Sequence, residues 1–415
     1  MRNSKFEKAK SILKKYNQED LLLFFDSLSD SQKDLLLDQI FSIDFEQIFN
    51  LYKISMTDNF KFDKLSPLPH IEKNLLSKQD IDFYTSIGDD ILKQNVFAVV
   101  TMAGGQGSRL GYNGPKGTYP LDLKHKRKSL FEIMCEDIKR ANNKYDIIIP
   151  WFIMTSSEND FATKKFFEDN NFFNYPKDKI FFFSQGNLPI IDVNGNLLLK
   201  DPYLIMEASN GNGDVFYSLY KNGFIVYMKD IGIRFISFGG IDNILLKNVD
   251  PLFLGLTVYN KRKIASKSIF KEEPLDKVAV FCKKDDKPGI LDYDDIDIKL
   301  SEQKDSNGLY LYREANILSH LMSIDAVSKV SKIKLPYHRA FKKNSFINKE
   351  GVKEVPEKPN TFKFESFIFD AFKYFDDMLL LRVNSEEEFA PIKSFTGIYN
   401  PDTAKQKYIK YWGKL

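Results

Sequence analysis

Residues 96–121 of the chain read VFAVVTMAGGQGSRLGYNGPKGTYPL, an apolar run followed at once by a glycine-rich segment. The run over 96–102 has the length and composition of a buried β-strand. Glycines let successive backbone N–H groups approach an anion without a Cβ atom in the way. Because loops at the carboxyl edge of an α/β sheet bind ligands, we expect residues 103–111 to form a phosphate cradle.

The same alternation of strand and helix continues through most of the chain. Short apolar runs predict strands at 96–101, 147–154, 180–183, 233–238 and 277–282, and helical spacing occupies stretches between them, such as 129–141. This order is typical of βαβ units. We therefore predict an α/β protein with a Rossmann-like, doubly wound mixed sheet.

The first 90 residues have a different pattern. Apolar residues recur at helical spacing over 6–53 and again over 71–92, with a polar, proline-containing connector at 57–69. We expect residues 1–90 to form an N-terminal helical region. A second polar stretch, 283–305, fits a hairpin or an insertion.

Composition excludes several classes of protein. With 60 Lys and Arg against 57 Asp and Glu, the net charge of +3 favours neither nucleic acid nor an anionic membrane as partner. Cys135 and Cys282 lie far apart without a C-x-x-C motif, so we interpret them as buried thiols of a reducing compartment. The charged first ten residues lack a signal-peptide pattern, and every apolar run is shorter than a membrane span. We expect a cytoplasmic protein.

The glycine-rich segment carries two cations, Arg109 and Lys116, placed to neutralise charge on a phosphoryl group. A Walker A loop is disfavoured because the spacing of Gly111 and Lys116 does not match G-x-x-x-x-G-K-[ST]. The dinucleotide pattern G-x-G-x-x-G fails at Leu110, and no ribose-binding carboxylate is evident. The pattern that matches is G-G-x-G-[ST]-R-x-G followed by P-K, the loop of nucleotidyltransferases that make nucleotide sugars.

This segment resembles the UDP-sugar pyrophosphorylase superfamily, and more specifically its UDP-N-acetylhexosamine branch. Further matches follow in the family's order at 150–156, 181–189, 211–213, 241–245, 314–317, 364–370 and 386–393. The resemblance implies the nucleotide-diphospho-sugar transferase fold, with a catalytic domain over 91–395. Residues 396–415 would stand as a short tail in place of the family's further C-terminal domain, and on that basis we expect a monomer.

The resemblance also implies a role for individual positions. The catalytic cations would be Arg109 and Lys116. The nucleotide would be bound by Ala103, Gly104, Gly105, Gln106, Gly107, Gln185 and Gly211, with Gln185 and Gly211 reading the uracil edge. The sugar side would be lined by Asn212, Asp292, Asn316, Phe367, Phe369 and Lys393, and Asp242 would ligate Mg²⁺.

The implied reaction is in-line attack of a sugar 1-phosphate on the α-phosphorus of UTP, giving UDP-sugar and pyrophosphate. An ionised phosphate needs neither a protein nucleophile nor a strong base, which fits a chain with four histidines. N-acetylglucosamine 1-phosphate is the expected substrate. Glucose or galactose 1-phosphate remains an alternative because Asp292 stands where N-acetylhexosamine enzymes carry a glutamate. A non-catalytic nucleotide-sugar sensor and an NAD-dependent oxidoreductase are the alternatives from other classes.

Several of these residues also have a purely structural interpretation. Asp242 could belong to a turn after a strand, and Asn316 could cap a helix that begins nearby. Lys393, behind an acidic run, could be a solvated surface charge. Phe367 and Phe369 could be core residues of an alternating strand.

Overall fold

The computed structural model describes residues 2–57, 64–123, 126–271, 273, 278–292, 296 and 298–413. It divides into two compact units. The first unit comprises Met1–Phe60, Gly186–Gly213 and Leu335–Phe367, and the second comprises Lys61–Gln185, Asp214–Lys334 and Ile368–Leu415. The helices before residue 90 are thus shared between the two units. The part of the expected connector at 58–63 lies outside the described residues.

The first unit combines N-terminal helices with short antiparallel strands from two later segments. The helices are α1 (Arg2–Lys15), α2 (Asp30–Ser42) and α3 (Phe45–Thr57). The strands are β8 (Asn187–Pro189), β9 (Ile191–Asp192), β10 (Leu199–Asp201), β11 (Leu204–Ile205), β12 (Glu207–Ser209), β18 (His338–Lys342), β19 (Phe346–Ile347), β20 (Lys353–Glu354) and β21 (Thr361–Glu365). They form three small sheets, β11-β10-β19-β20, β12-β8 and β18-β21-β9.

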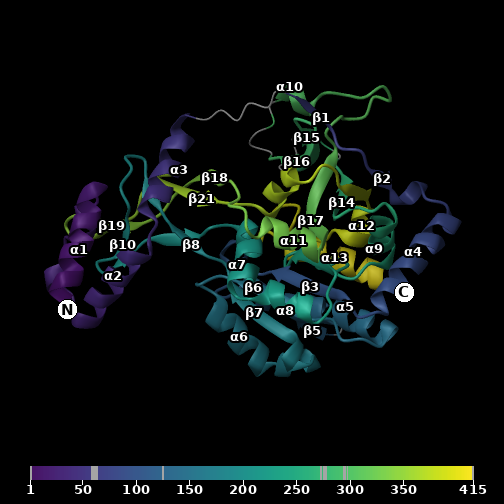
Figure 1. Ribbon diagram of the computed structural model, residues 1–415, viewed down its shortest axis with the longest axis horizontal. Helices are drawn as coiled ribbons and strands as arrows, with labels where there is room; N and C mark the ends of the chain where they lie inside the picture. The colour runs from purple at the N-terminus through teal and green to yellow at the C-terminus, as the bar shows by residue number, and fades with distance from the viewer. Residues whose placement is uncertain are drawn as a thin grey trace. The chain divides into compact units, whose positions relative to one another are not determined.

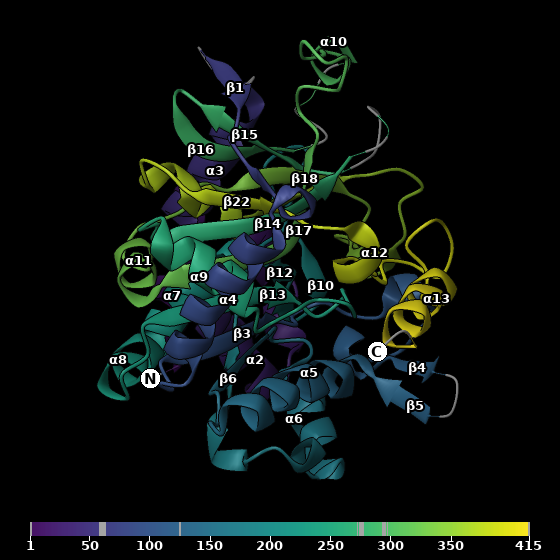
Figure 2. The same cartoon turned by 90° about the vertical axis from the view of Figure 1, so that its right-hand side faces the viewer.

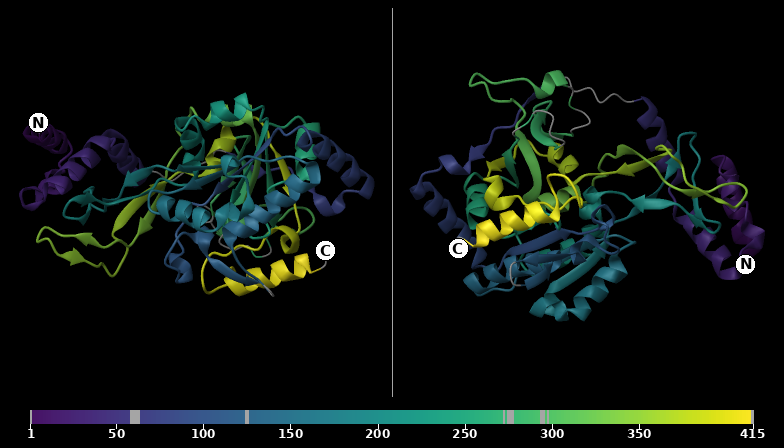
Figure 3. Two further views of the ribbon diagram at one scale, coloured as in Figure 1. Left: turned by 90° about the horizontal axis from the view of Figure 1, so that it is seen from below. Right: turned by 180° about the vertical axis from the view of Figure 1, so that it is seen from behind.

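The helices of the first unit pack on these strands through one apolar cluster. Helix α2 begins at a capping box, in which the Ser29 hydroxyl accepts from the Gln32 N–H and the Gln32 side chain accepts from the Ser29 N–H. Its buried face places Leu36 and Ile40 in a cluster that also holds Ile205 of β11. Figures 1 and 3 show the purple helices beside the teal and yellow-green strands of this unit.

The second unit is built on an eleven-stranded sheet whose main order is β2-β22-β14-β17-β13-β3-β6-β7. Its strands are β1 (Leu65–Pro67), β2 (Ile71–Glu72), β3 (Phe97–Met102), β6 (Trp151–Thr155), β7 (Ile180–Ser184), β13 (Phe235–Gly240), β14 (Ile264–Phe270), β15 (Val280–Lys284), β16 (Lys287–Leu291), β17 (Glu314–Ser323) and β22 (Leu379–Arg382). Strands β4 (Pro120–Leu123) and β5 (Lys126–Ser129) form a separate hairpin.

The sheet is mixed, as expected. Strands β13, β3, β6 and β7 run parallel to one another, whereas β17 is antiparallel to both β13 and β14. The chain leaves β3 to form β6 and β7 on one side and later returns to place β13 on the other side of β3. The order of the strands therefore reverses at β3, and such a reversal is where open α/β sheets bind ligands.

Helices cover both faces of this sheet. The α-helices of the second unit are α4 (Lys78–Leu92), α5 (Leu130–Tyr145), α6 (Asp160–Asp169), α7 (Val215–Lys221), α8 (Phe224–Asp230), α9 (Pro251–Tyr259), α10 (Ile298–Ser301), α11 (Ile324–Val330), α12 (Ser385–Glu388) and α13 (Pro401–Trp412). On one face the Trp151 ring lies 5.6 Å from Phe167 of α6, and on the other Phe152 lies 5.3 Å from Phe224 of α8. Figure 2 shows α7, α8 and α11 on one side of the sheet and α5 on the other.

The described residues test several smaller expectations. The polar stretch after 283 begins within the antiparallel β15–β16 hairpin, and both cysteines are buried and unpaired, as expected. Two of the structural alternatives are wrong: Asn316 lies inside strand β17 rather than at a helix start, and Phe369 lies in a 3-10 helix, Ile368–Tyr374, rather than on a strand. Phe367 lies between β21 and that 3-10 helix. No helix in the described ranges is long and apolar enough to cross a bilayer.

Candidate active site

The glycine-rich loop leaves the carboxyl end of β3 and is held from two sides. The N–H of Ala103 donates to the Met154 carbonyl oxygen of β6 at 2.8 Å. The side-chain nitrogen of Asn159 donates to the carbonyl oxygens of Ala103 and Gly105 at 2.9 and 3.2 Å. The N–H of Lys116 also donates to the Gly105 carbonyl, at 3.0 Å. With its carbonyl groups engaged in this way, the loop has a defined backbone conformation.

Three consecutive N–H groups of the loop have no protein acceptor among the described residues. In that part of the chain, the N–H groups of Gly104, Gly105 and Gln106 donate no hydrogen bond to another protein group. A Cβ atom on Gly105 would meet nothing within 4 Å, so the loop is open on that side. Adjacent donors in an open loop form a concavity suited to an anion. The geometry agrees with the phosphate cradle expected from the sequence.

Gln185 lies directly against the loop. It follows β7, its N–H donates to the Thr155 carbonyl oxygen at 3.0 Å, and its side chain is only 8% exposed. A Cβ atom built on Gly104 would lie 2.3 Å from Gln185 Nε2. Only glycine therefore allows the carboxamide to lie so close to the loop, where it is placed beside the unpaired N–H groups.

A cluster of charges lies at the same edge of the sheet. Lys116, 9% exposed, places Nζ 3.8 Å from Oδ2 of Asp242, which lies two residues after the end of β13. Burial lowers the pKa of Lys116; Asp242 opposes this shift, and the positive charges of Arg109 and Lys393 add to it. The structure thus brings three cations and one carboxylate from three distant parts of the sequence into electrostatic contact.

The segment that carries Lys393 is tied to this cluster by main-chain hydrogen bonds. The N–H of Ile392 donates to the Asp242 carbonyl oxygen, and the N–H of Phe395 donates to that of Arg109, both at 2.9 Å. Lys393 itself is half-buried, with Nζ 5.0 Å from the centre of the Tyr399 ring. Lys393 is therefore part of the cluster rather than a solvated charge behind the acidic run.

A metal ion fits this edge only together with a phosphate ligand. Among the described residues, no group of three or more His, Cys, Asp or Glu side chains is arranged to hold a metal. The side chain of Asp242 is 26% exposed and so is open to an incoming ion. Mg²⁺ is commonly bound by one or two carboxylates plus substrate phosphates rather than by a cage of protein ligands.

The expected residues of the first unit come together within that unit. Gly211 has φ +94°, and a Cβ atom there would lie 2.2 Å from the Ser366 carbonyl oxygen. The N–H of Gly213 donates to the same oxygen at 3.0 Å, and a Cβ atom on Gly213 would lie 2.8 Å from the backbone of Phe367. Glycines thus allow the loop that contains Asn212 to pack on the segment that contains Phe367.

Three expected sugar residues lie elsewhere in the second unit. Asn316, on β17, uses Oδ1 to accept the N–H of Leu318 at 2.9 Å. Asp292 follows β16 and is half-buried, as is Phe369. For these three residues a sugar contact stays a prediction.

Asn159 holds the loop in place through its buried side chain, and no sequence pattern points to it. An asparagine shortly after a strand is common in turns, so its position alone carried no distinguishing signal.

Comparison with known proteins shows the family of this chain. Residues 42–399 match the family model described as UTP–glucose-1-phosphate uridylyltransferase. The chain belongs to this family. It is 32% identical to the UDP-N-acetylglucosamine pyrophosphorylase of Saccharomyces cerevisiae, over 96% of this chain and 85% of that protein. It is also 32% identical to UDP-N-acetylglucosamine diphosphorylase 2 of Arabidopsis thaliana, over 93% of this chain and 79% of that protein.

A solved structure in the same family has the same fold. The uridine diphosphate N-acetylglucosamine pyrophosphorylase of Trypanosoma brucei superposes with a TM-score of 0.85 at 25% identity, over 98% of this chain and 84% of that one. These matches confirm the resemblance, the α/β fold class and the uridylyltransferase activity expected from the glycine-rich loop.

Proposed function

We propose that this uridylyltransferase uses N-acetylglucosamine 1-phosphate and UTP, with Mg²⁺ as the metal, and forms UDP-N-acetylglucosamine and pyrophosphate. The observation that carries the proposal is the cluster of Arg109, Lys116, Lys393 and Asp242 beside the open N–H groups of the glycine-rich loop. The choice of sugar is supported by the names of the yeast and Arabidopsis relatives.

The chemistry needs positioning and charge neutralisation more than proton transfer. The N–H groups of Gly104, Gly105 and Gln106 would bind phosphate oxygens of UTP, and the Gln185 carboxamide would orient the base. Arg109 and Lys116 would neutralise the charge that develops as the bond to pyrophosphate breaks. Mg²⁺, held by Asp242 and phosphate oxygens, would supply further positive charge when bound.

On the sugar side, Lys393 would bind the attacking phosphate. Asn212, Asp292, Asn316, Phe367 and Phe369 would contact the sugar, and Gly211 would contact uracil. Asp292 has a side chain one methylene shorter than glutamate, so glucose and galactose 1-phosphate are the substrates to compare. Two buried, unpaired cysteines are consistent with the proposed cytoplasmic location. A monomer remains the predicted state and can be checked by light scattering.

The test is release of pyrophosphate from UTP and Mg²⁺ with four sugar 1-phosphates: N-acetylglucosamine, N-acetylgalactosamine, glucose and galactose. The proposal expects the highest kcat/KM with N-acetylglucosamine 1-phosphate. A higher value with glucose or galactose 1-phosphate would correct the sugar. Binding of UTP without release of pyrophosphate from any of the four would favour the nucleotide-sugar sensor.

A further inference from the structure

Asn243 is the residue after Asp242, and its side chain points into the protein instead of toward the ligand. It is 2% exposed. Its Nδ2 donates to the Glu388 carbonyl oxygen at 2.8 Å, and its Oδ1 accepts the N–H of Ala390 at 2.9 Å. One carboxamide therefore ties the loop after β13 to the end of α12, from which the chain continues to Lys393.

Buried charges hold the Glu388 end of this connection in place. The Glu388 carboxylate is 1% exposed and lies 2.5 Å from Nζ of Lys267, which is fully buried on β14. Lys267 also contacts Asp250 at 2.6 Å. Burial raises the pKa of Glu388, but Lys267 and Lys247 outweigh it, and the net effect lowers that pKa. Glu388 therefore stays charged, and its ion pair with Lys267 holds it against strand β14 of the sheet.

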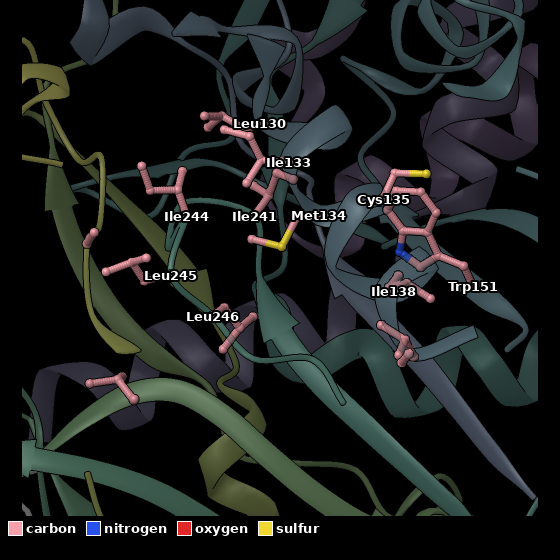
Figure 4. Packing of buried hydrophobic residues seen from close by; sticks show 14 of the residues in the cluster. Leu130, Ile133, Met134, Cys135, Ile138, Trp151, Ile241, Ile244, Leu245 and Leu246 are labelled. Atoms are coloured by element: carbon pink, nitrogen blue, oxygen red, sulfur yellow. The ribbon is translucent and has the colours of Figure 1, made fainter. Parts of the chain in front are cut away.

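Apolar packing holds the other end of the connection, the loop that contains Asp242 and Asn243. Ile241 and Ile244 flank the Asp242–Asn243 pair and are 4% and 3% exposed. Figure 4 shows both side chains beside Leu130 and Ile133 of α5. Packing therefore holds the main chain of the loop. The two bonds of the Asn243 side chain and two main-chain bonds, from Ile244 N–H to the Ala390 carbonyl at 3.2 Å and from Ile392 N–H to the Asp242 carbonyl at 2.9 Å, join this loop to the segment that carries Lys393.

We propose that Asn243 is a positioning residue that sets the distance between the Asp242 carboxylate and the Lys393 ammonium group. The inference rests on the proposed roles of these two residues in binding the metal and phosphate. Asn243 contacts neither charged group. It acts through its hydrogen bonds to the Glu388 carbonyl oxygen and the Ala390 N–H. The bond from the Ile392 N–H to the Asp242 carbonyl oxygen also joins the two segments.

The test is the Mg²⁺ dependence of UTP binding, measured by calorimetry, for wild type and Asn243→Ala. Residues that orient metal ligands typically change metal affinity by about 10-fold to 100-fold when they are replaced. We expect Asn243→Ala to raise the Mg²⁺ concentration for half-maximal enhancement of UTP binding by about 10-fold. UTP affinity without metal should not change. In turnover, kcat should fall more than KM for UTP rises.

The matched control is Asn142→Ala. The Asn142 carboxamide also bridges two groups, the Tyr175 hydroxyl and the Ile149 N–H, but it lies near the end of α5 and bonds none of the residues of the charge cluster. This variant should lower the melting temperature and leave the Mg²⁺ titration of wild type unchanged. If Asn243→Ala does not fold, Glu388→Gln is the second variant. It weakens the ion pair between Glu388 and Lys267, and it should also raise the Mg²⁺ concentration for half-maximal enhancement of UTP binding.

A Mg²⁺ titration of folded Asn243→Ala that overlays wild type would overturn the inference, as would an equal shift in Asn142→Ala. The measurement does not need turnover. If wild type shows metal-dependent UTP binding but releases no pyrophosphate with any sugar 1-phosphate, the proposed reaction fails and the titrations still decide the role of Asn243. If wild type shows no metal-dependent UTP binding, both fail.

Discussion

Nζ of Lys116 lies 3.8 Å from Oδ2 of Asp242, although one residue follows β3 and the other follows β13. The two strands are parallel neighbours, with Gly240 in register with Met102, so their carboxyl ends meet at one edge of the sheet. The carboxylate offsets part of the cost of burying the ammonium group. A triphosphate entering the cradle would compete for Lys116 and leave Asp242 available to a metal.

Replacement of Lys116 tests the catalytic cation. Lys116→Ala should lower kcat by about 100-fold or more, the size of effect seen when one donor that stabilises a transition state is lost. The fold should remain, because the variant also removes a buried charge. Steady-state release of pyrophosphate and a thermal melt check both statements. A wild-type kcat in the variant would exclude the catalytic role.

Replacement of Asp242 tests the metal site. Asp242→Asn keeps the shape of the side chain but removes the negative charge, and a carboxamide is a poor ligand for a hard cation. We expect a higher Mg²⁺ concentration for half-maximal activity, and EDTA should abolish turnover in wild type. If the titration of the variant matched wild type, the metal would have to be held by another group.

The contact between Gly104 and Gln185 predicts a change in UTP recognition. Gly104→Ala forces the Gln185 carboxamide to move, and the KM for UTP should rise about 10-fold, equivalent to the loss of one hydrogen bond. Gln185→Ala should have a similar effect, and the double variant should be less than additive. Gly289→Ala is the control, since the atoms nearest to its Cβ would all belong to the flexible Lys284 side chain. If the two substitutions changed the KM for UTP additively, Gly104 and Gln185 would not act together in binding UTP.

A buried histidine predicts how stability depends on pH. His320 is fully buried, bonds Ser266 through Nδ1 at 2.7 Å, and has its pKa lowered by burial to about 3. The unfolded chain binds a proton near pH 6.5, whereas the folded protein does not until about pH 3. Stability from this group is therefore present above pH 6.5 and is lost as the pH falls, by at most about 1.4 kcal/mol per pH unit.

The check is the melting temperature at pH 7 and pH 5 for wild type and His320→Leu. The variant has no group to protonate at this position, so its melting temperature should fall less between the two pH values, even if it is lower at pH 7. An equal fall in both proteins would mean that His320 does not contribute to the pH dependence.

Much of the second unit could be inferred from local patterns. The apolar run before Gly104 and the run before Asp242 both formed strands, and both functional segments lie where those strands end. Such predictions succeed because a buried strand needs a continuous apolar run and because parallel strands direct their carboxyl ends to a common edge. Local pattern does not predict the strand that contains Asn316, because this strand forms by pairing with β13 and β14, which are distant in sequence.

The amino-acid pattern alone was enough to indicate an α/β sheet and, through its resemblance, the family, because periodicity and short motifs are local properties of the chain; the phosphate-binding role of the loop stays a prediction. It could not indicate that Lys393 joins Arg109 and Asp242, that Asn159 and Asn243 fasten the loops around them, or that residues 186–213 and 335–367 form one unit with the N-terminal helices. Those relationships depend on contacts between residues far apart in sequence, which form only when the packed sheet brings the segments together.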